Sequence, residues 1–507
     1  MLRKISGVGG WTLLSRVFGF VRDAVMAAVL GAGALADAFL IALRLPNHFR
    51  AIFAEGAFST AFVPAYSRTL EAEGAPAARQ FAGQLLTLML LSQLLLLGIA
   101  LLATPGLLQL LAPGIAADPV LAPLAATLTR ICFPYLLCMA LLSVLAGVLN
   151  AHHRYAAAAA APILLNLGIL IALLWHLWFE TPAHAAAWGV LVAGFAELAL
   201  VWWAARRAGL LPRLQQPRLS AAVRQFFRAL GPATVGSMGT QLALFADTII
   251  ASLLAGGALS ALYYADRINQ LPIGVIGIAA GTVVLPEMAR RLAAGDTTGA
   301  QTAQNRTIET TLLFALPCLL AFVCVPEAIM RGLFGRGAFD EAAVLAAAQT
   351  LRAYAIGLLP FVLLRSVAAS FNARGETGTP VKAAFAGIGL NVALKLLLMG
   401  SMAQTGLALA TSAGAWLNLL LIGGWAWSRG WLQPDARLWR ALLAMLPGTL
   451  LVLALLLCGP AAVHATLQTL APRWVDEWLL ALLAAAAALA WFMPVVLLRG
   501  WVRRATH

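Results

Sequence analysis

Long apolar stretches recur along nearly the whole chain, each close to the length of a membrane-spanning helix, and short polar segments separate them. A spanning helix needs about 20 mostly apolar residues, because hydrocarbon cannot hydrogen-bond to exposed backbone groups. The pattern therefore predicts an all-α integral membrane protein with about fourteen transmembrane helices. The expected spans are 8–31, 35–62, 80–104, 124–149, 156–178, 185–205, 230–254, 263–286, 308–330, 346–371, 381–400, 404–427, 439–458 and 477–498.

Loop charge agrees with this topology, because Lys and Arg alternate between abundant and absent from one loop to the next. The segments without Lys or Arg are 31–36, 105–123, 179–184, 255–262 and 401–405. Basic loops stay on the cytoplasmic side of the membrane, so both termini are expected in the cytoplasm. Only the loops near Arg331 and near Arg473 depart from the alternation.

Composition narrows the class further. Hydrophobic residues make up 62% of the 507 and charged residues only 11%, which leaves little room for a soluble domain. Lys and Arg number 34 against 20 Asp and Glu. In a membrane protein this excess favours contact with anionic lipids rather than nucleic acid. The five cysteines lie in apolar runs, so neither a disulfide nor a metal site is expected.

No pattern typical of an enzyme stands out. The chain shows no nucleophile beside a base, no His and Cys cluster and no phosphate-binding glycine loop, so catalytic residues and cofactors are expected to be absent. The first apolar stretch is interrupted by Arg16 and Arg22, which argues against a cleavable signal peptide.

An internal repeat divides the chain. Residues 23–35, DAVMAAVLGAGAL, align without a gap with residues 247–259, DTIIASLLAGGAL. An even number of helices in each copy keeps both in the same orientation, so we expect two parallel six-helix lobes with a cavity between them. The expected domains are an N-terminal lobe (1–217), an amphipathic helix with a C-terminal lobe (218–430), and two additional helices with a cytoplasmic tail (431–507).

Ionisable residues interrupt the apolar stretches, at a cost of about 2.5–3.5 kcal/mol each on insertion scales. They are Arg16, Arg22, Asp23, Asp37, Arg44, Arg50 and Glu55 in the first half, and Asp247, Asp266, Arg267, Arg365 and Lys395 in the second. Each alone could form a buried ion pair or reach an interface. As a set, the surplus of arginine in the first two helices favours an anionic ligand, because guanidinium binds phosphate with two parallel hydrogen bonds.

A second group of polar residues has two interpretations. Asp247, Asn391 and Thr411 offer oxygens that could bind a small cation. Lys395 lies one helical turn beyond Asn391 and could instead form an ion pair with Asp247, which is the interpretation we favour.

These residues also resemble a known family. The N-terminal signature of the MurJ/MviN lipid II flippases is similar to Ser15-Arg16, Phe20, Arg22-Asp23, Gly31, Gly33, Asp37-Ala38-Phe39, Leu45-Pro46-Asn47, Arg50, residues 53–58 (FAEGAF) and Phe62-Val63-Pro64. The second half resembles the same family in residues 263–267 (YYADR), in Leu271-Pro272 and in residues 379–382 (TPVK).

The resemblance implies the fold of the multidrug/oligosaccharidyl-lipid/polysaccharide exporters, in which two six-helix lobes are followed by two helices that form a lipid-tail groove. It also implies that the chain moves lipid II, an undecaprenyl-pyrophosphate-linked disaccharide pentapeptide, from the inner to the outer leaflet of the bacterial cytoplasmic membrane. Transport would proceed by alternating access in a monomer.

The resemblance further implies roles for individual residues. Arg22, Arg50 and Arg267 would form a triad that binds pyrophosphate. The further substrate-binding, cavity or gate residues would be Arg16, Asn47, Asp23, Asp37, Glu55 and Ser260. The chain has Asn269-Gln270 where some members carry an acid, so a carboxylate role there is not transferred.

Three alternatives are weighed against this hypothesis. A multidrug antiporter of the same fold would need a surplus of acidic residues in its cavity, the opposite of the observed sign. A flippase for another polyprenyl-linked oligosaccharide would fit the arginine surplus equally well. A membrane-bound lipid phosphatase or glycosyltransferase would need catalytic residues at the interface, which the sequence does not offer.

Overall fold

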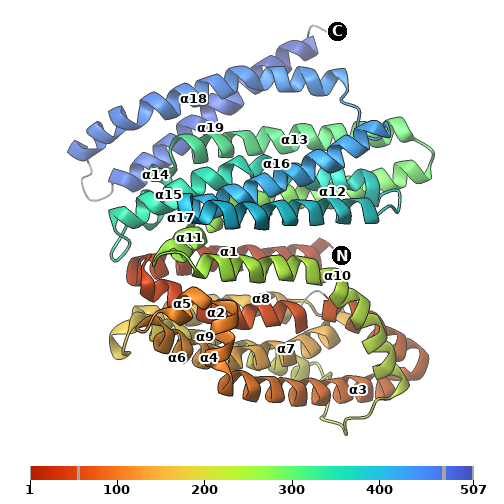
Figure 1. Cartoon of the computed structure of the whole chain (residues 1–507). Helices are drawn as coiled ribbons and strands as arrows, with labels where there is room; N and C mark the ends of the chain where they lie inside the picture. The colour runs from red at the N-terminus through yellow and green to blue at the C-terminus, as the bar shows by residue number, and fades with distance from the viewer. Residues whose placement is uncertain (1, 54–56, 471–474, 505–507) are drawn as a thin grey trace. The chain divides into compact units, whose positions relative to one another are not determined.

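The structure is a computed structural model that describes residues 2–53, 57–470 and 475–504. The secondary-structure elements in these ranges are all helices, which confirms the expected all-α membrane class. The chain divides into two compact units, Met1–Gly257 and Ala258–His507 (Figure 1). These units are defined by packing, which does not test the expected repeat lobes, so 1–217, 218–430 and 431–507 remain a prediction.

The first unit is a chain of helices joined by short turns. Its elements are α1 (Leu2–Leu30), α2 (Ala34–Phe53), α3 (Ala57–Leu102), α4 (Thr104–Leu111), α5 (Pro113–Ala117), α6 (Leu121–Cys132), α7 (Pro134–Ala151), α8 (Ala156–Leu174), the short η1 (His176–Trp178), α9 (Pro182–Arg207) and α10 (Ala221–Ser252). Helices α7 and α9 begin with a proline, whose fixed φ and missing N–H suit the first helical position. Helix α3 breaks at Gly74, where φ is +83°.

The second unit is organised in the same way. Its elements are α11 (Ala258–Pro272), the π-helical turn η2 (Ile273–Gly277), α12 (Ile278–Ala293), α13 (Thr297–Cys324), α14 (Pro326–Phe334), α15 (Glu341–Ile356), α16 (Leu358–Asn372), α17 (Gly378–Ser428), α18 (Ala436–Leu470) and α19 (Val475–Arg504). The π-helical turn follows Pro272 directly, where the ring removes one backbone donor from the helix.

Ten helical segments within the described residues are long and apolar enough to cross a membrane. One of them, Gly378–Ser428, spans 51 residues and breaks at Ala403, between the expected spans 381–400 and 404–427. Helices α1 and α2 are not among the ten, because ionisable residues interrupt their apolar stretches. The expected number of about fourteen spans therefore remains a prediction.

Small residues allow close helix contacts in the first unit. A Cβ atom at Gly168 of α8 would lie 2.9 Å from the carbonyl oxygen of Gly189 on α9, and one at Gly189 would lie 2.8 Å from the carbonyl oxygen of Gly168. The two backbones therefore touch with no side chain between them. Such contacts stabilise helix pairs in lipid, where association depends on close packing rather than on the hydrophobic effect.

The start of α10 packs against α3. Phe226 is fully buried, and its ring centroid lies 5.5 Å from that of Phe58 and 6.5 Å from that of Phe81. Phe227 is 44% exposed, and Arg224, one turn earlier on the helix, is exposed as well. The start of α10, which was expected to be amphipathic, thus packs an apolar face against α3.

The two C-terminal helices form a pair in the second unit. Helices α18 and α19 run side by side (Figure 1) and pack on α13 and α14. Trp491 of α19 is fully buried, and its Nε1 donates to the carbonyl oxygen of Leu313 on α13 at 2.8 Å. Gly448 of α18 lies against the same ring, because a Cβ there would be 3.2 Å from the Trp491 Cε3. This indole therefore holds the pair to α13.

The glycine contact between α8 and α9 generates the first prediction. We expect Gly189→Val to lower the free energy of unfolding by about 1–3 kcal/mol, because the added side chain must separate two touching backbones. Gly98→Val is the matched control, since a Cβ at that helical glycine meets nothing within 4 Å. Thermal unfolding of both purified variants in detergent checks this. Equal melting temperatures for the two variants would contradict the close contact.

Candidate functional site

Arg22 of α1 is buried, and neighbouring groups hold its guanidinium in place. Its Nε and Nη2 donate to Oδ1 of Asp23 at 3.1 and 2.7 Å, and its Nη1 donates to Oδ1 of Asn166 on α8 at 2.9 Å. The Nδ2 of Asn166 donates in turn to the carbonyl oxygen of Ser15 at 3.0 Å. These charge-assisted bonds fix the plane of the guanidinium, and Asp23 balances its charge.

Asn47 and Arg50 are brought together on α2. They lie one turn apart, and the Nε of Arg50 donates to Oδ1 of Asn47 at 3.1 Å. Both side chains are half-buried, so they combine access with a defined orientation. Arg16, by contrast, is exposed on α1. Glu55 lies outside the described residues.

Asp37 has a structural contact at the start of α2. Its side chain is buried, and its Oδ2 accepts a hydrogen bond from the backbone N–H of Gly257 at 2.6 Å. Gly257 has φ at +91°, and a Cβ there would lie 2.6 Å from the carbonyl oxygen of Ala32. Only glycine fits this conformation without strain. Asp37 therefore ties the turn after α10 to the turn that precedes α2.

Sequence reasoning missed three polar residues of the first unit. Asn166 is a partner of Arg22, and Oγ1 of Thr248 on α10 lies 3.0 Å from the Nε2 of the buried His48 on α2. Asn166 and Thr248 are neutral residues within apolar runs, where an amide or hydroxyl costs less than a charge. A search for isolated Asn and His in those runs, rather than for charges alone, could have found Asn166 and His48.

The second unit holds the remaining expected substrate and gate residues. Arg267 of α11 is exposed, and its Nη2 donates to the hydroxyl of Tyr263 at 3.0 Å. Ser260 is fully buried one turn before Tyr263. Arg22 and Arg50 belong to the first unit and Arg267 to the second, so the expected convergence of the three on one ligand remains a prediction.

The expected cation site or ion pair is likewise divided between the units. Asp247 lies on α10, while Asn391, Lys395 and Thr411 lie on α17. Within α17 the two halves touch, because a Cβ at Gly414 would lie 2.9 Å from the Cβ of Asn391. This contact places Asn391 near the turn that contains Thr411. Lys395 is buried. The proposed partnership of Asp247 with Lys395 remains a prediction.

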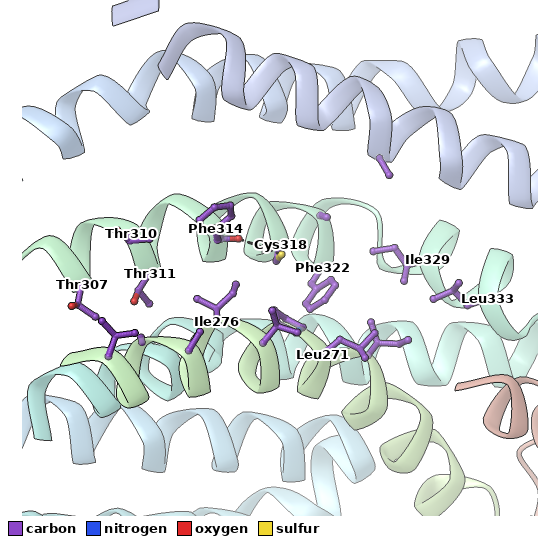
Figure 2. Close-up of a pocket in the computed structure, with 18 of the residues that line it drawn as sticks. Leu271, Ile276, Thr307, Thr310, Thr311, Phe314, Cys318, Phe322, Ile329 and Leu333 are labelled. Carbon is purple, nitrogen blue, oxygen red and sulfur yellow. Dashed lines mark hydrogen bonds between the residues drawn. The ribbon is translucent and has the colours of Figure 1, made fainter. Parts of the chain in front are cut away.

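An apolar pocket of about 960 Å³ lies within the second unit. Its lining residues are Ile268, Leu271, Pro272, Val275, Ile276, Ala279, Ala280, Val283, Arg306, Thr307, Thr310, Thr311, Phe314, Cys318, Ala321, Phe322, Ile329, Leu333, Leu480 and Ala484. In Figure 2 the labelled side chains of α13, from Thr307 to Phe322, face Leu271 and Ile276 across the pocket. Most of this wall is hydrocarbon, with threonines gathered toward one end.

A charged network borders the threonine end of the apolar pocket. Arg306 pairs with Glu309 at 3.3 Å and with Asp435 at 2.8 Å. Burial alone would raise the pKa of Asp435, but the backbone N–H of Leu438 and the guanidinium of Arg306 hold that pKa below its ordinary value. Asp435 therefore stays ionised at neutral pH and keeps Arg306 paired.

The family model described as "Lipid II flippase MurJ" matches residues 26–476 of the chain. The chain belongs to the MurJ lipid II flippase family. A probable lipid II flippase MurJ from Rhizobium meliloti (strain 1021) is 44% identical, over 85% of this chain and 82% of that protein. Membership confirms the resemblance seen in the sequence and the interpretation of the chain as a transporter rather than an enzyme.

Solved structures show how widely the fold is shared. A lipid II flippase MurJ in an inward closed conformation has a TM-score of 0.79 at 21% identity, covering 98% of this chain and 99% of that one. An inward-facing multidrug resistance transporter of the MATE family, from the MOP superfamily, has a TM-score of 0.67 at 16% identity, covering 84% and 95%. The fold is therefore common to both classes, and the sequence match is what separates MurJ members from multidrug transporters.

The buried Arg22–Asp23 pair generates the second prediction. We expect Asp23→Ala to lower the free energy of unfolding by about 3–5 kcal/mol, because it leaves a buried guanidinium without its counter-charge. Glu71→Ala removes an exposed carboxylate and is the control, with an expected change within about 0.5 kcal/mol. Unfolding of each variant in mixed micelles is the measurement.

A second variant separates charge imbalance from lost packing. If the penalty arises from the unpaired charge, Arg22→Ala combined with Asp23→Ala should be more stable than the sum of the single changes predicts. Strict additivity in this double-mutant cycle would show that the pair contributes no interaction energy.

Proposed function

We propose that this chain moves lipid II from the inner to the outer leaflet of the bacterial cytoplasmic membrane. The observation that carries the proposal is the match to the MurJ family over residues 26–476. Lipid II joins a polar disaccharide pentapeptide to a polyprenyl tail through a pyrophosphate. The head group cannot cross hydrocarbon unaided, whereas the tail can remain in the lipid, so the protein must supply a polar path for the head alone.

Arginine side chains suit the pyrophosphate of that head group. Guanidinium forms paired hydrogen bonds with phosphate oxygens and stays charged at biological pH. We propose that Arg22, Arg50 and Arg267 bind the pyrophosphate together, with Arg16 and Asn47 nearby. In support, Asn166 and Asp23 fix the orientation of Arg22, and Asn47 fixes that of Arg50. Preorganised donors bind a ligand with a smaller loss of conformational entropy.

The apolar pocket suits the polyprenyl tail. Its walls consist mainly of Leu, Ile, Val, Ala and Phe side chains, and its volume is about 960 Å³. The tail groove was expected along the two C-terminal helices. In the structure the pocket is formed mainly by α11 to α14, with Leu480 and Ala484 as the contribution of α19. We propose that part of the tail lies in this pocket while the head group is bound.

The transport cycle is proposed to be alternating access, in which the arginine cavity opens first to the cytoplasm and then to the periplasm. Ser260 would help to close the outer side, and Asp23, Asp37 and Glu55 would belong to the cavity or the gate. The alternation of basic and uncharged loops supports a cytoplasmic location for both termini. We further propose that the transporter works as a monomer.

Depletion of the protein in its own bacterium tests the function. Lipid II should accumulate on the inner leaflet, where an added periplasmic enzyme or probe cannot reach it. Accumulation of a different polyprenyl-linked oligosaccharide would identify another flippase substrate. Increased sensitivity to organic cations with normal lipid II would instead indicate multidrug transport.

The proposed paired hydrogen bonds between arginine and phosphate generate the third prediction. We expect Arg22→Lys and Arg50→Lys to insert normally but to lose at least about 90% of flipping, because lysine keeps the charge and loses the fork that binds two phosphate oxygens. Arg213→Lys, in an exposed loop of the same unit, is the matched control and should retain activity. The measurement is lipid II accessibility in reconstituted vesicles. Full activity of either lysine variant would refute paired binding of the phosphate.

The apolar pocket generates the fourth prediction. We expect Ala321→Phe to reduce flipping several-fold, because the added ring occupies space proposed for the tail. Val323→Phe on the same helix is the control, because Val323 is 37% exposed and does not line the pocket. Both variants are compared for lipid II flipping and for crosslinking to a photoreactive polyprenyl probe. Equal crosslinking and flipping in the two variants would place the tail elsewhere.

A further inference from the structure

Glu197 is a buried carboxylic acid that none of the roles described above uses. It lies on α9, within the apolar segment Pro182–Arg207, and only 2% of its surface is exposed. Its Oε2 is buried and has no hydrogen-bond partner among the described residues. A carboxylate oxygen enclosed in this way is costly when ionised, because it is buried and no protein donor reaches it.

The rest of the Glu197 carboxyl group is held by its neighbours. The hydroxyl of Tyr135 on α7 and the main chain of Leu165 on α8 hydrogen-bond to it. Gly194, one turn before Glu197, lets the Tyr135 ring approach, since a Cβ there would lie 2.7 Å from Cδ2 of that ring. The side chain is therefore fixed in position, with one oxygen satisfied and the other able to carry a proton.

The charged group that acts on Glu197 most directly is Arg50 of α2. The other elements that pack against α9 also carry titratable residues, except α8, which has none. Among them are Arg16, Arg22 and Asp23 of α1, Asp37, Arg44 and His48 of α2, Arg130 and Cys132 of α6, Tyr135 and Cys138 of α7, and His176 of η1. Arg22 is already balanced by Asp23. The charge of Glu197 therefore acts mainly on Arg50.

Ionisable groups inside membrane segments commonly bind protons or ions as part of transport. We propose that Glu197 is a proton-binding site, and that its ionised form competes with the anionic head group for Arg50. This inference rests on the proposed function, because the competing ligand is the pyrophosphate of lipid II. Hydronium in solution gives up a proton to the Glu197 carboxylate: one O–H bond of hydronium breaks, one forms on the carboxylate, and the products are water and a neutral carboxylic acid.

The competition for Arg50 determines the sign of the coupling between proton binding and lipid II binding. When Glu197 is ionised, it balances part of the charge on Arg50 and weakens the attraction of that guanidinium for phosphate. When Glu197 is protonated, this weakening is removed, and Arg50 attracts phosphate more strongly. Binding is reciprocal, so a ligand that binds better to the protonated form must in turn increase the affinity of Glu197 for its proton. Lipid II binding should therefore take up a proton.

Two measurements on the purified full-length protein test this. The first is proton uptake on adding lipid II in weakly buffered detergent solution, repeated across a pH series together with the dissociation constant. The lipid II pyrophosphate is esterified at both ends, so it has no proton that titrates near neutral pH. The second is the infrared band of a protonated buried carboxyl group, followed with pH in the absence of ligand.

In the wild-type protein we expect tighter lipid II binding as the pH falls, uptake of up to about one proton per ligand, and a carboxyl band that disappears at high pH. Glu197→Gln should remove the band and the proton uptake. At high pH it should bind lipid II about fivefold or more tightly than wild type, since a neutral side chain no longer competes. Glu71→Gln, at an exposed position, should behave like wild type.

Tyr135→Phe provides a second variant in case Glu197→Gln does not fold. It removes a donor to the carboxylate, so the carboxyl band should persist to higher pH than in wild type. Proton uptake that is unchanged in Glu197→Gln, or a wild-type band absent at every pH while lipid II still binds, would overturn the proton site. A titrating Glu197 band without any lipid II binding would overturn the proposed function and, with it, the competition for Arg50.

Discussion

A charged or polar side chain within a hydrocarbon layer must find its partners inside the protein, because the lipid offers none. This constraint accounts for the polar cluster of the first unit. Arg22 is enclosed by Asp23 and Asn166, and Asp37 accepts from the backbone of Gly257. Each contact lowers the cost of a group that the apolar helices would otherwise exclude. Together they join α1 to α8 and the turn after α10 to α2.

Close helix approach is what makes these partnerships possible. Gly168 and Gly189 bring the backbones of α8 and α9 into contact, and Gly194 lets Tyr135 reach α9. Side chains that carry amide or hydroxyl groups are short, so these groups can contact a charged neighbour only when the helices lie near one another. The small residues therefore set the distance between the helices, and the polar residues form hydrogen bonds across that distance.

The chemistry of the two units differs in a way that suits an amphiphilic substrate. The first unit contains the buried Arg22 pair, the Arg50 and Asn47 contact and the enclosed Glu197. The second contains a large apolar pocket with a charged network at one end. A lipid-linked anion presents the same two kinds of surface.

The sequence by itself determined the all-α membrane class, the family and the residue types needed to bind a phosphate, because apolar length and buried charge are local properties that each stretch displays alone. It also marked the break between 381–400 and 404–427. It could not identify Asn166 as the partner of Arg22, the single unsatisfied oxygen of Glu197, or the walls of the apolar pocket. Those depend on distances between helices far apart in the chain, and only the tertiary packing of small and large side chains decided them.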